Sequence, residues 1–171
     1  MTNPTQFAVV VVAAVACVYD LRTRRIPNVL TFGAALAALV FHAAVAGASG
    51  AMTTAGGWLL GIALFFPIFA LGGLGAGDVK LLGAIGAWLG PAVVLPVGIY
   101  SALAGGIFAI VVALRIGYLG QALRNLKVLG TFWLTVGFKP VEGLTLEHEA
   151  APRLAYALPM FVGLLVTLWL Q

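Results

Sequence analysis

The stretch Gly72–Gly86, GGLGAGDVKLLGAIG, joins a glycine-rich segment to an apolar run and places one aspartate, Asp78, at the junction. The rest of the chain is very apolar. Of its 171 residues, 63% are hydrophobic and only 8% are charged, and the mean hydropathy is +1.12. Soluble domains carry about 25% charged residues, so the composition predicts an integral membrane protein. A carboxylate in such a chain is a candidate functional group, because it is costly to bury.

The apolar segments on both sides of this stretch predict an all-α, polytopic membrane protein with six transmembrane helices. A helix needs about 20 apolar residues to cross a bilayer, so the run 79–114 must contain two short helices. We expect the break between them at Gly90-Pro91 or at Pro96. We expect a single domain, 1–171, whose first apolar segment is a retained helix because signal-peptide features are missing. The other apolar segments are 7–19, 29–48, 56–71 and 154–170.

The basic residues predict the orientation. With six helices, every Lys and Arg falls on one side of the membrane, and the positive-inside rule makes that side cytoplasmic. Both termini then face out (N-out/C-out). The pI near 9.6 is therefore explained by orientation and by contact with membrane lipids, and no nucleic-acid partner is predicted. The basic residues are Arg22, Arg24, Arg25, Lys80, Arg115, Arg124, Lys127, Lys139 and Arg153.

A cytoplasmic loop of about 116–152 is the only sizeable polar region. Its first half spaces basic residues among apolar ones, which predicts a helix on the membrane surface. Its second half reads as loop and holds three of the five acids. The neighbours Glu147, His148 and Glu149 do not converge on one ion, and a lone cysteine, Cys17, excludes a multi-cysteine zinc site. No metal and no other cofactor is predicted.

Two carboxylates lie beside membrane segments. Asp20 ends the first segment and Asp78 begins the fourth, so the topology places both at the same depth, on the cytoplasmic side. A structural alternative is that Asp78 caps its helix and that each acid pairs with a nearby base. That alternative explains each acid alone but does not explain their common depth. The bases in question are Arg22, Arg24 and Arg25 for Asp20, and Lys80 for Asp78.

Such a pair of carboxylates suits peptide hydrolysis without a metal. Two acids held close together share a proton, so the ionised one can activate a water while the protonated one donates to the substrate. Gly75 and Gly77 carry no side chain, and a substrate backbone could therefore approach Asp78 closely.

The residues around both aspartates also match a known family. Gly75-Ala76-Gly77-Asp78 is the GxGD signature of membrane aspartyl proteases, and its context GLGAGDVKLLGAIGAWLG resembles the type IV prepilin peptidases. The segment Asp20–Asn28, DLRTRRIPN, resembles that family's first aspartate and the basic R-x-I-P-N segment after it. A weaker likeness covers RLAYALP, residues 153–159.

The resemblance implies an aspartyl endopeptidase of the bacterial inner membrane, with its active site facing the cytoplasm. It would remove the short basic leader from prepilins or pseudopilins, whose hydrophobic helix would dock between the spans. Asp20 and Asp78 would be the catalytic pair. The positions implied for the motif or the substrate approach are Gly75, Gly77, Lys80, Pro27 and Asn28.

The number of cysteines indicates a subtype of this family. Many larger members carry an N-terminal cytoplasmic insert with two CxxC pairs and also methylate the new N-terminus. This chain has one cysteine, so it resembles the short Tad/Cpa-type form of Flp pili, and methylation is not expected. We expect the acidic side chains of the loop to attract the basic leader: Glu142, Glu147 and Glu149.

Two other functions fit part of the pattern. A small proton- or cation-coupled transporter also uses intramembrane carboxylates, but it places them near the midplane. A non-catalytic subunit of a pilus or secretion assembly would tolerate the loss of either aspartate. Presenilin and signal peptide peptidase share the Tyr19-Asp20 and GxGD pattern but have more spans.

Overall fold

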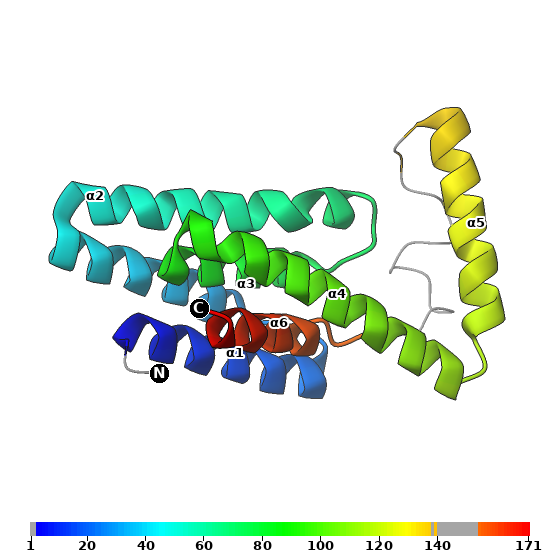
Figure 1. Ribbon diagram of the computed structural model, residues 1–171, viewed down its shortest axis with the longest axis horizontal. Coiled ribbons are helices and arrows are strands. Elements are labelled where there is room, and N and C mark those ends of the chain that lie inside the picture. The colour runs from blue at the N-terminus through cyan, green and yellow to red at the C-terminus, as the bar shows by residue number, and fades with distance from the viewer. Residues whose placement is uncertain (1–2, 138, 140–153) are drawn as a thin grey trace.

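The computed structural model describes residues 3–137, 139 and 154–171. The described part of the chain folds into six α-helices, which confirms the all-α class (Figure 1). Within this part, α1, α2 and α4 are long and apolar enough to cross a membrane. The helices are α1 (Pro4–Thr23), α2 (Asn28–Ala70), α3 (Ala76–Leu89), α4 (Pro91–Arg115), α5 (Leu119–Val136) and α6 (Ala157–Trp169).

Both ends of α1 follow from local side-chain and backbone chemistry. The Asn3 side chain accepts a hydrogen bond from the Thr5 N–H at 3.2 Å, and Pro4 takes the first turn, where its missing N–H costs nothing. The helix ends at Arg24, which has a left-handed φ of 54° and donates its N–H to the Asp20 carbonyl at 2.9 Å. A non-glycine residue adopts this conformation at a cost of roughly 1–2 kcal/mol. This left-handed residue lies one helical turn after Asp20.

The reversal within α2 is tighter than the sequence predicts. We expected two separate helices over 29–48 and 56–71, but the only break in α2 is at Gly47, with φ 61° and ψ −142°. Only glycine adopts this backbone readily. The first arm (28–46) and the second arm (48–70) then run side by side (Figure 1). Close contact between the arms explains the short turn, because a Cβ at Gly50 would overlap the His42 carbonyl.

The predicted break within the apolar run 79–114 is confirmed at Gly90-Pro91. Gly90 has a positive φ of 79°, and Pro91 starts α4. The alternative break at Pro96 is wrong, since Pro96 lies inside α4. At this place near the start of the helix, its ring and missing N–H disturb only the first turn.

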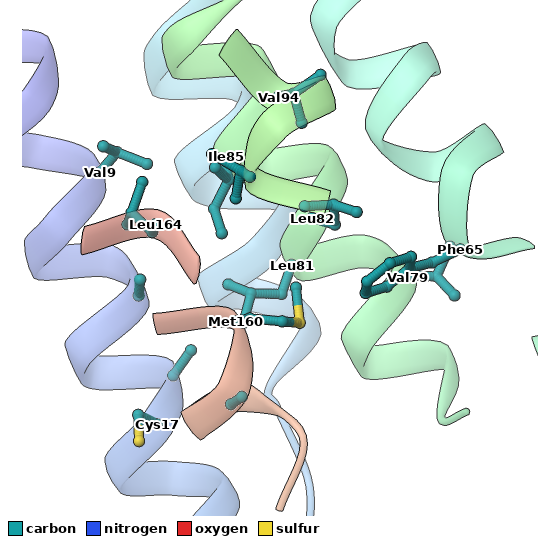
Figure 2. Packing of buried hydrophobic residues seen from close by; sticks show 14 of the residues in the cluster. Val9, Cys17, Phe65, Val79, Leu81, Leu82, Ile85, Val94, Met160 and Leu164 are labelled. Atoms are coloured by element: carbon teal, nitrogen blue, oxygen red, sulfur yellow. The ribbon is translucent and has the colours of Figure 1, made fainter. Parts of the chain in front are cut away.

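The core is built around α3, which packs against α1, α2, α4 and α6. Figure 2 shows Leu81 and Ile85 of α3 lying between the side chains of the neighbouring helices. α3 and α2 approach so closely at Gly86 and Gly57 that a Cβ on either glycine would overlap the other's carbonyl. Small residues permit this kind of helix contact in membrane proteins. Because α3 is fixed on all sides, its first turn, with Asp78, is fixed as well.

The polar region contains the predicted helix, α5. Figure 1 shows α5 standing away from the bundle, beyond the end of α4. The helix itself is confirmed, and its position on a membrane surface stays a prediction. The acids expected to attract the leader, together with His148 and Arg153, lie outside the described residues.

The two ends of the bundle differ. The N- and C-termini lie toward one end, and the last turn of α1 and the first turn of α3 lie toward the other (Figure 1). This arrangement agrees with the expected order of the segments. The six membrane crossings and the N-out/C-out orientation remain predictions.

Candidate active site

A cleft of about 320 Å³ lies where α1 ends, α2 begins and α3 begins. It contains Asp20 and Asp78, which are far apart in the chain and which the sequence predicts at one membrane depth. Of the other predicted site residues, Gly75, Gly77, Lys80 and Asn28 line the same cleft. Pro27 is not among the lining residues and instead occupies the N-cap position of α2. The cleft is completed by Arg24, Arg25, Ile26 and Ala76.

Asp20 is buried in the last turn of α1, with 7% of its surface exposed. Its Oδ2 accepts a hydrogen bond from the backbone N–H of Ala157 at 3.1 Å, across 137 positions of sequence. Ala157 is the first residue of α6, so the positive end of a helix dipole faces this carboxylate. The sequence analysis did not identify Ala157, although the weaker likeness over residues 153–159 pointed to the segment.

Asp78 is held by hydrogen bonds to a residue that lies just before it in the chain. Its Oδ2 accepts a hydrogen bond from the Gly75 N–H at 3.1 Å, and its own N–H donates to the Gly75 carbonyl at 3.1 Å. Asp78 is therefore not the N-cap residue of α3, but its carboxylate does cap the helix by accepting the N–H of the N-cap residue, so this part of the structural alternative is confirmed. Gly75 holds the N-cap position and Asp78 lies three residues into the helix.

Both motif glycines make room for the protein's own atoms. A Cβ at Gly75 would lie 3.1 Å from Oδ2 of Asp78, which is tight for a real contact. A Cβ at Gly77 would lie 3.2 Å from Cβ of Ile26, in the segment between α1 and α2. In this structure the glycines thus allow the Asp78 side chain to fold back and the Ile26 segment to pack on α3.

The surroundings of Asp78 favour its protonated form. This residue precedes the apolar part of α3 and lies outside the three helices long enough to cross a membrane. Burial raises its pKa to about 7, the Asp20 carboxylate adds to the increase, and the hydrogen bond from Gly75 opposes it. Near neutral pH, Asp78 therefore gains and loses a proton readily.

Lys80 does not serve Asp78 as an ion-pair partner here. Its ammonium donates to Oδ1 of Asn28 at 2.9 Å and lies 5.5 Å from the ring centroid of Phe32. Both contacts reach across to the start of α2, and the aromatic face attracts the cation. Lys80 therefore ties the first turn of α2 to α3 at the edge of the cleft.

Tyr156 supports the segment that reaches Asp20, and the sequence analysis missed it. Its hydroxyl donates to the Ser101 carbonyl at 3.3 Å, and its ring stands edge-on to Phe65 at 5.7 Å. The signal that could have found it is its place within the RLAYALP stretch, residues 153–159.

In the described part of the chain, no three His, Cys, Asp or Glu side chains gather in a way that could hold a metal ion. The arrangement is that of a buried carboxylate, Asp20, and a half-buried one, Asp78, each with one backbone donor, in a cleft also lined by basic side chains. Such a site can move protons to and from a bound peptide bond.

A comparison with known protein families finds a match that covers the cleft. The model of the type IV leader peptidase family matches residues 7–110, which is more than half of the chain. The match includes both aspartates and every residue that lines the cleft. No curated protein and no solved structure matches the chain.

Proposed function

The chain belongs to the type IV leader peptidase family, whose members are aspartic-type prepilin peptidases, and we propose that Asp20 and Asp78 are its catalytic pair. The family implies prepilin substrates and a place in the inner membrane. One observation carries the proposal: a buried carboxylate, Asp20, and a half-buried one, Asp78, come from distant parts of the matched region and line one cleft. Their position at the ends of α1 and α3 argues against a transporter, which would hold such acids near the membrane midplane.

The mechanism assigns a different role to each carboxylate. Asp20, with the Ala157 N–H directed at it, accepts a proton from a water whose oxygen attacks the scissile carbonyl carbon. Asp78, whose surroundings favour the protonated form, donates its proton to the carbonyl oxygen. The tetrahedral intermediate then collapses, the C–N bond breaks, and the proton on Asp20 passes to the leaving amine. The diol hydroxyl returns a proton to Asp78.

The proposed substrate is a Flp-type prepilin whose short basic leader is removed at the cytoplasmic face. We place the whole single domain, 1–171, in the membrane with six crossings and with both termini outside. The clustered basic residues support this orientation, as does the position of both termini at the end opposite the cleft. The lone cysteine supports the short, Tad/Cpa-type form.

A cleavage assay tests the proposal. The protein is expressed with a Flp-type prepilin from the same genome, and removal of the leader is scored on a gel for the wild type, Asp20→Asn and Asp78→Asn. Asparagine keeps the size of the side chain but cannot act as acid or base. Each variant should lose at least about 10²-fold in rate while inserting at the normal level. Efficient cleavage by either variant would show that the two carboxylates do not work as a pair.

A further inference from the structure

An apolar groove of about 260 Å³ runs between the two arms of α2, with α3 beneath it. Its walls contain no charged side chain. The groove opens to the outside of the bundle, since Leu36 is 61% exposed and Phe32 is 48% exposed. The first arm contributes Phe32, Ala35, Leu36 and Leu39, and the second arm contributes Ala55 and Trp58.

The groove is continuous with the catalytic cleft. On the first arm, Asn28, Phe32, Leu36 and Leu39 recur at the three- and four-residue spacing of one helix face. Asn28 lines the cleft and Phe32 lines the groove, and Lys80 contacts both of them. The face therefore changes from polar to apolar within one turn. It then stays apolar to Leu39, about 16 Å from Asn28 at the rise of an α-helix.

A bound peptide must leave the cleft along some path, and this surface suits a chain that turns apolar beyond the scissile bond. A substrate with polar residues there would find few hydrogen-bonding partners, because the walls are mostly apolar and the Thr54 hydroxyl among them already pairs with Nδ1 of His42 at 2.9 Å. We propose that the groove binds the hydrophobic helix of the prepilin directly after the cleavage site, parallel to the first arm of α2. The Lys80–Asn28 contact marks the point at which the substrate passes from cleft to groove. The inference rests on the proposed function.

Filling the groove tests the proposal. Ala55 in the groove and Ala102 on α4 are both exposed alanines within helices, and neither lines the catalytic cleft. Ala55→Trp should raise KM for the full-length prepilin about tenfold, while Ala102→Trp should leave it unchanged. Both variants should cleave a short peptide, made of the leader and a few residues after the scissile bond, as the wild type does.

The short peptide separates the two proposals. If Ala55→Trp cleaves the full-length prepilin normally, or loses the same factor on the short peptide, the groove does not hold the substrate helix. Equal losses in both tryptophan variants would contradict it as well. Failure of the wild type to cleave either substrate would instead count against the peptidase function itself.

Photocrosslinking gives an independent readout that needs no turnover. Leu36 in the groove and Leu103 on α4 are similarly exposed, at 61% and 58%. With Leu36→p-benzoylphenylalanine in an Asp78→Asn background, we expect a crosslink to the hydrophobic helix of the prepilin. The same replacement at Leu103 should yield none. A crosslink of equal strength at both positions, or at neither, would mean that lipid and not substrate occupies the groove.

Discussion

The two aspartates are held in opposite ways. Asp78 takes its backbone donor from Gly75, the N-cap residue three positions before it, whereas Asp20 takes its donor from Ala157, 137 residues away. One half of the site is therefore assembled locally, and the other exists only when α6 docks against α1. Mutations that disturb the packing of α6 should therefore change the surroundings of Asp20 and leave those of Asp78 unaltered.

The pH dependence tests which carboxylate carries the proton. Because burial raises the Asp78 pKa to about 7, a mechanism that needs its protonated form should lose kcat/KM about tenfold per pH unit above that value. At two units above, the loss reaches roughly 100-fold. A kcat/KM profile that stays flat from pH 7 to 9 would reverse the assigned roles.

The same shift has a consequence for stability. The pKa of Asp78 in the folded state lies above 3.8, the ordinary value of an aspartate, so the folded protein binds more protons than the unfolded chain between these two values. The free energy of unfolding should therefore fall as the pH rises from about 4 to 7 and should not change further above that range on account of this group. Asp78→Asn should remove this part of the slope, measured by denaturation in detergent.

Displacing α6 should disturb Asp20, because the hydrogen-bond donor of this carboxylate comes from that helix. A Cβ at Gly163 would lie 2.5 Å from the backbone nitrogen of Ser101, so Gly163→Ala must push α6 away from α4. We expect a loss of about 1–3 kcal/mol in the free energy of unfolding and roughly tenfold in kcat, because the Ala157 N–H moves with the helix.

The matched control for this change is Gly106→Ala on α4. A Cβ there meets no atom within 4 Å, so activity and stability should stay close to the wild type. If both alanine variants behave alike, the docking of α6 does not set the position of Asp20.

A side chain added beside Asp78 should leave the packing between the helices intact. A Cβ at Gly75 lies 3.1 Å from Oδ2 of Asp78, so Gly75→Ala should tilt this carboxylate by a few tenths of an ångström. We expect about a fivefold loss in kcat with a change in unfolding free energy below about 1 kcal/mol. Gly33→Ala, where the space is open, is the control. A larger loss of stability than in Gly163→Ala would contradict the distinction between local and long-range support.

The smallest expected change in stability comes from the hydrogen bond that joins α2 to α3. Removing the Lys80–Asn28 hydrogen bond in the double-mutant cycle of Asn28→Ala and Lys80→Met should give a coupling energy of about 0.5–1.5 kcal/mol. Thermal denaturation of the four proteins measures it. Strict additivity would mean that this contact does not hold the edge of the cleft.

Composition and periodicity were enough to predict much of the fold. The apolar segments yielded an all-helical membrane protein, the break at Gly90-Pro91 and a helix within the polar region, because these depend on local hydrophobicity and backbone preference. The turn in α2 is shorter than the sequence predicted. Residues 48–55 are helical because the second arm packs against the first, which local propensity cannot reveal.

The candidate site divides in the same way. The sequence by itself identified Asp20 and Asp78 and placed them at one depth, since the order of helices and the basic residues determine which ends face the same side. Tertiary structure alone decided the contacts that reach the site from other helices. The Ala157 donor, the support from Tyr156, and Lys80 turning to Asn28 all join segments far apart in the chain. Contacts of this kind depend on how the helices pack, and hydrophobic pattern does not encode the distances between side chains on different helices.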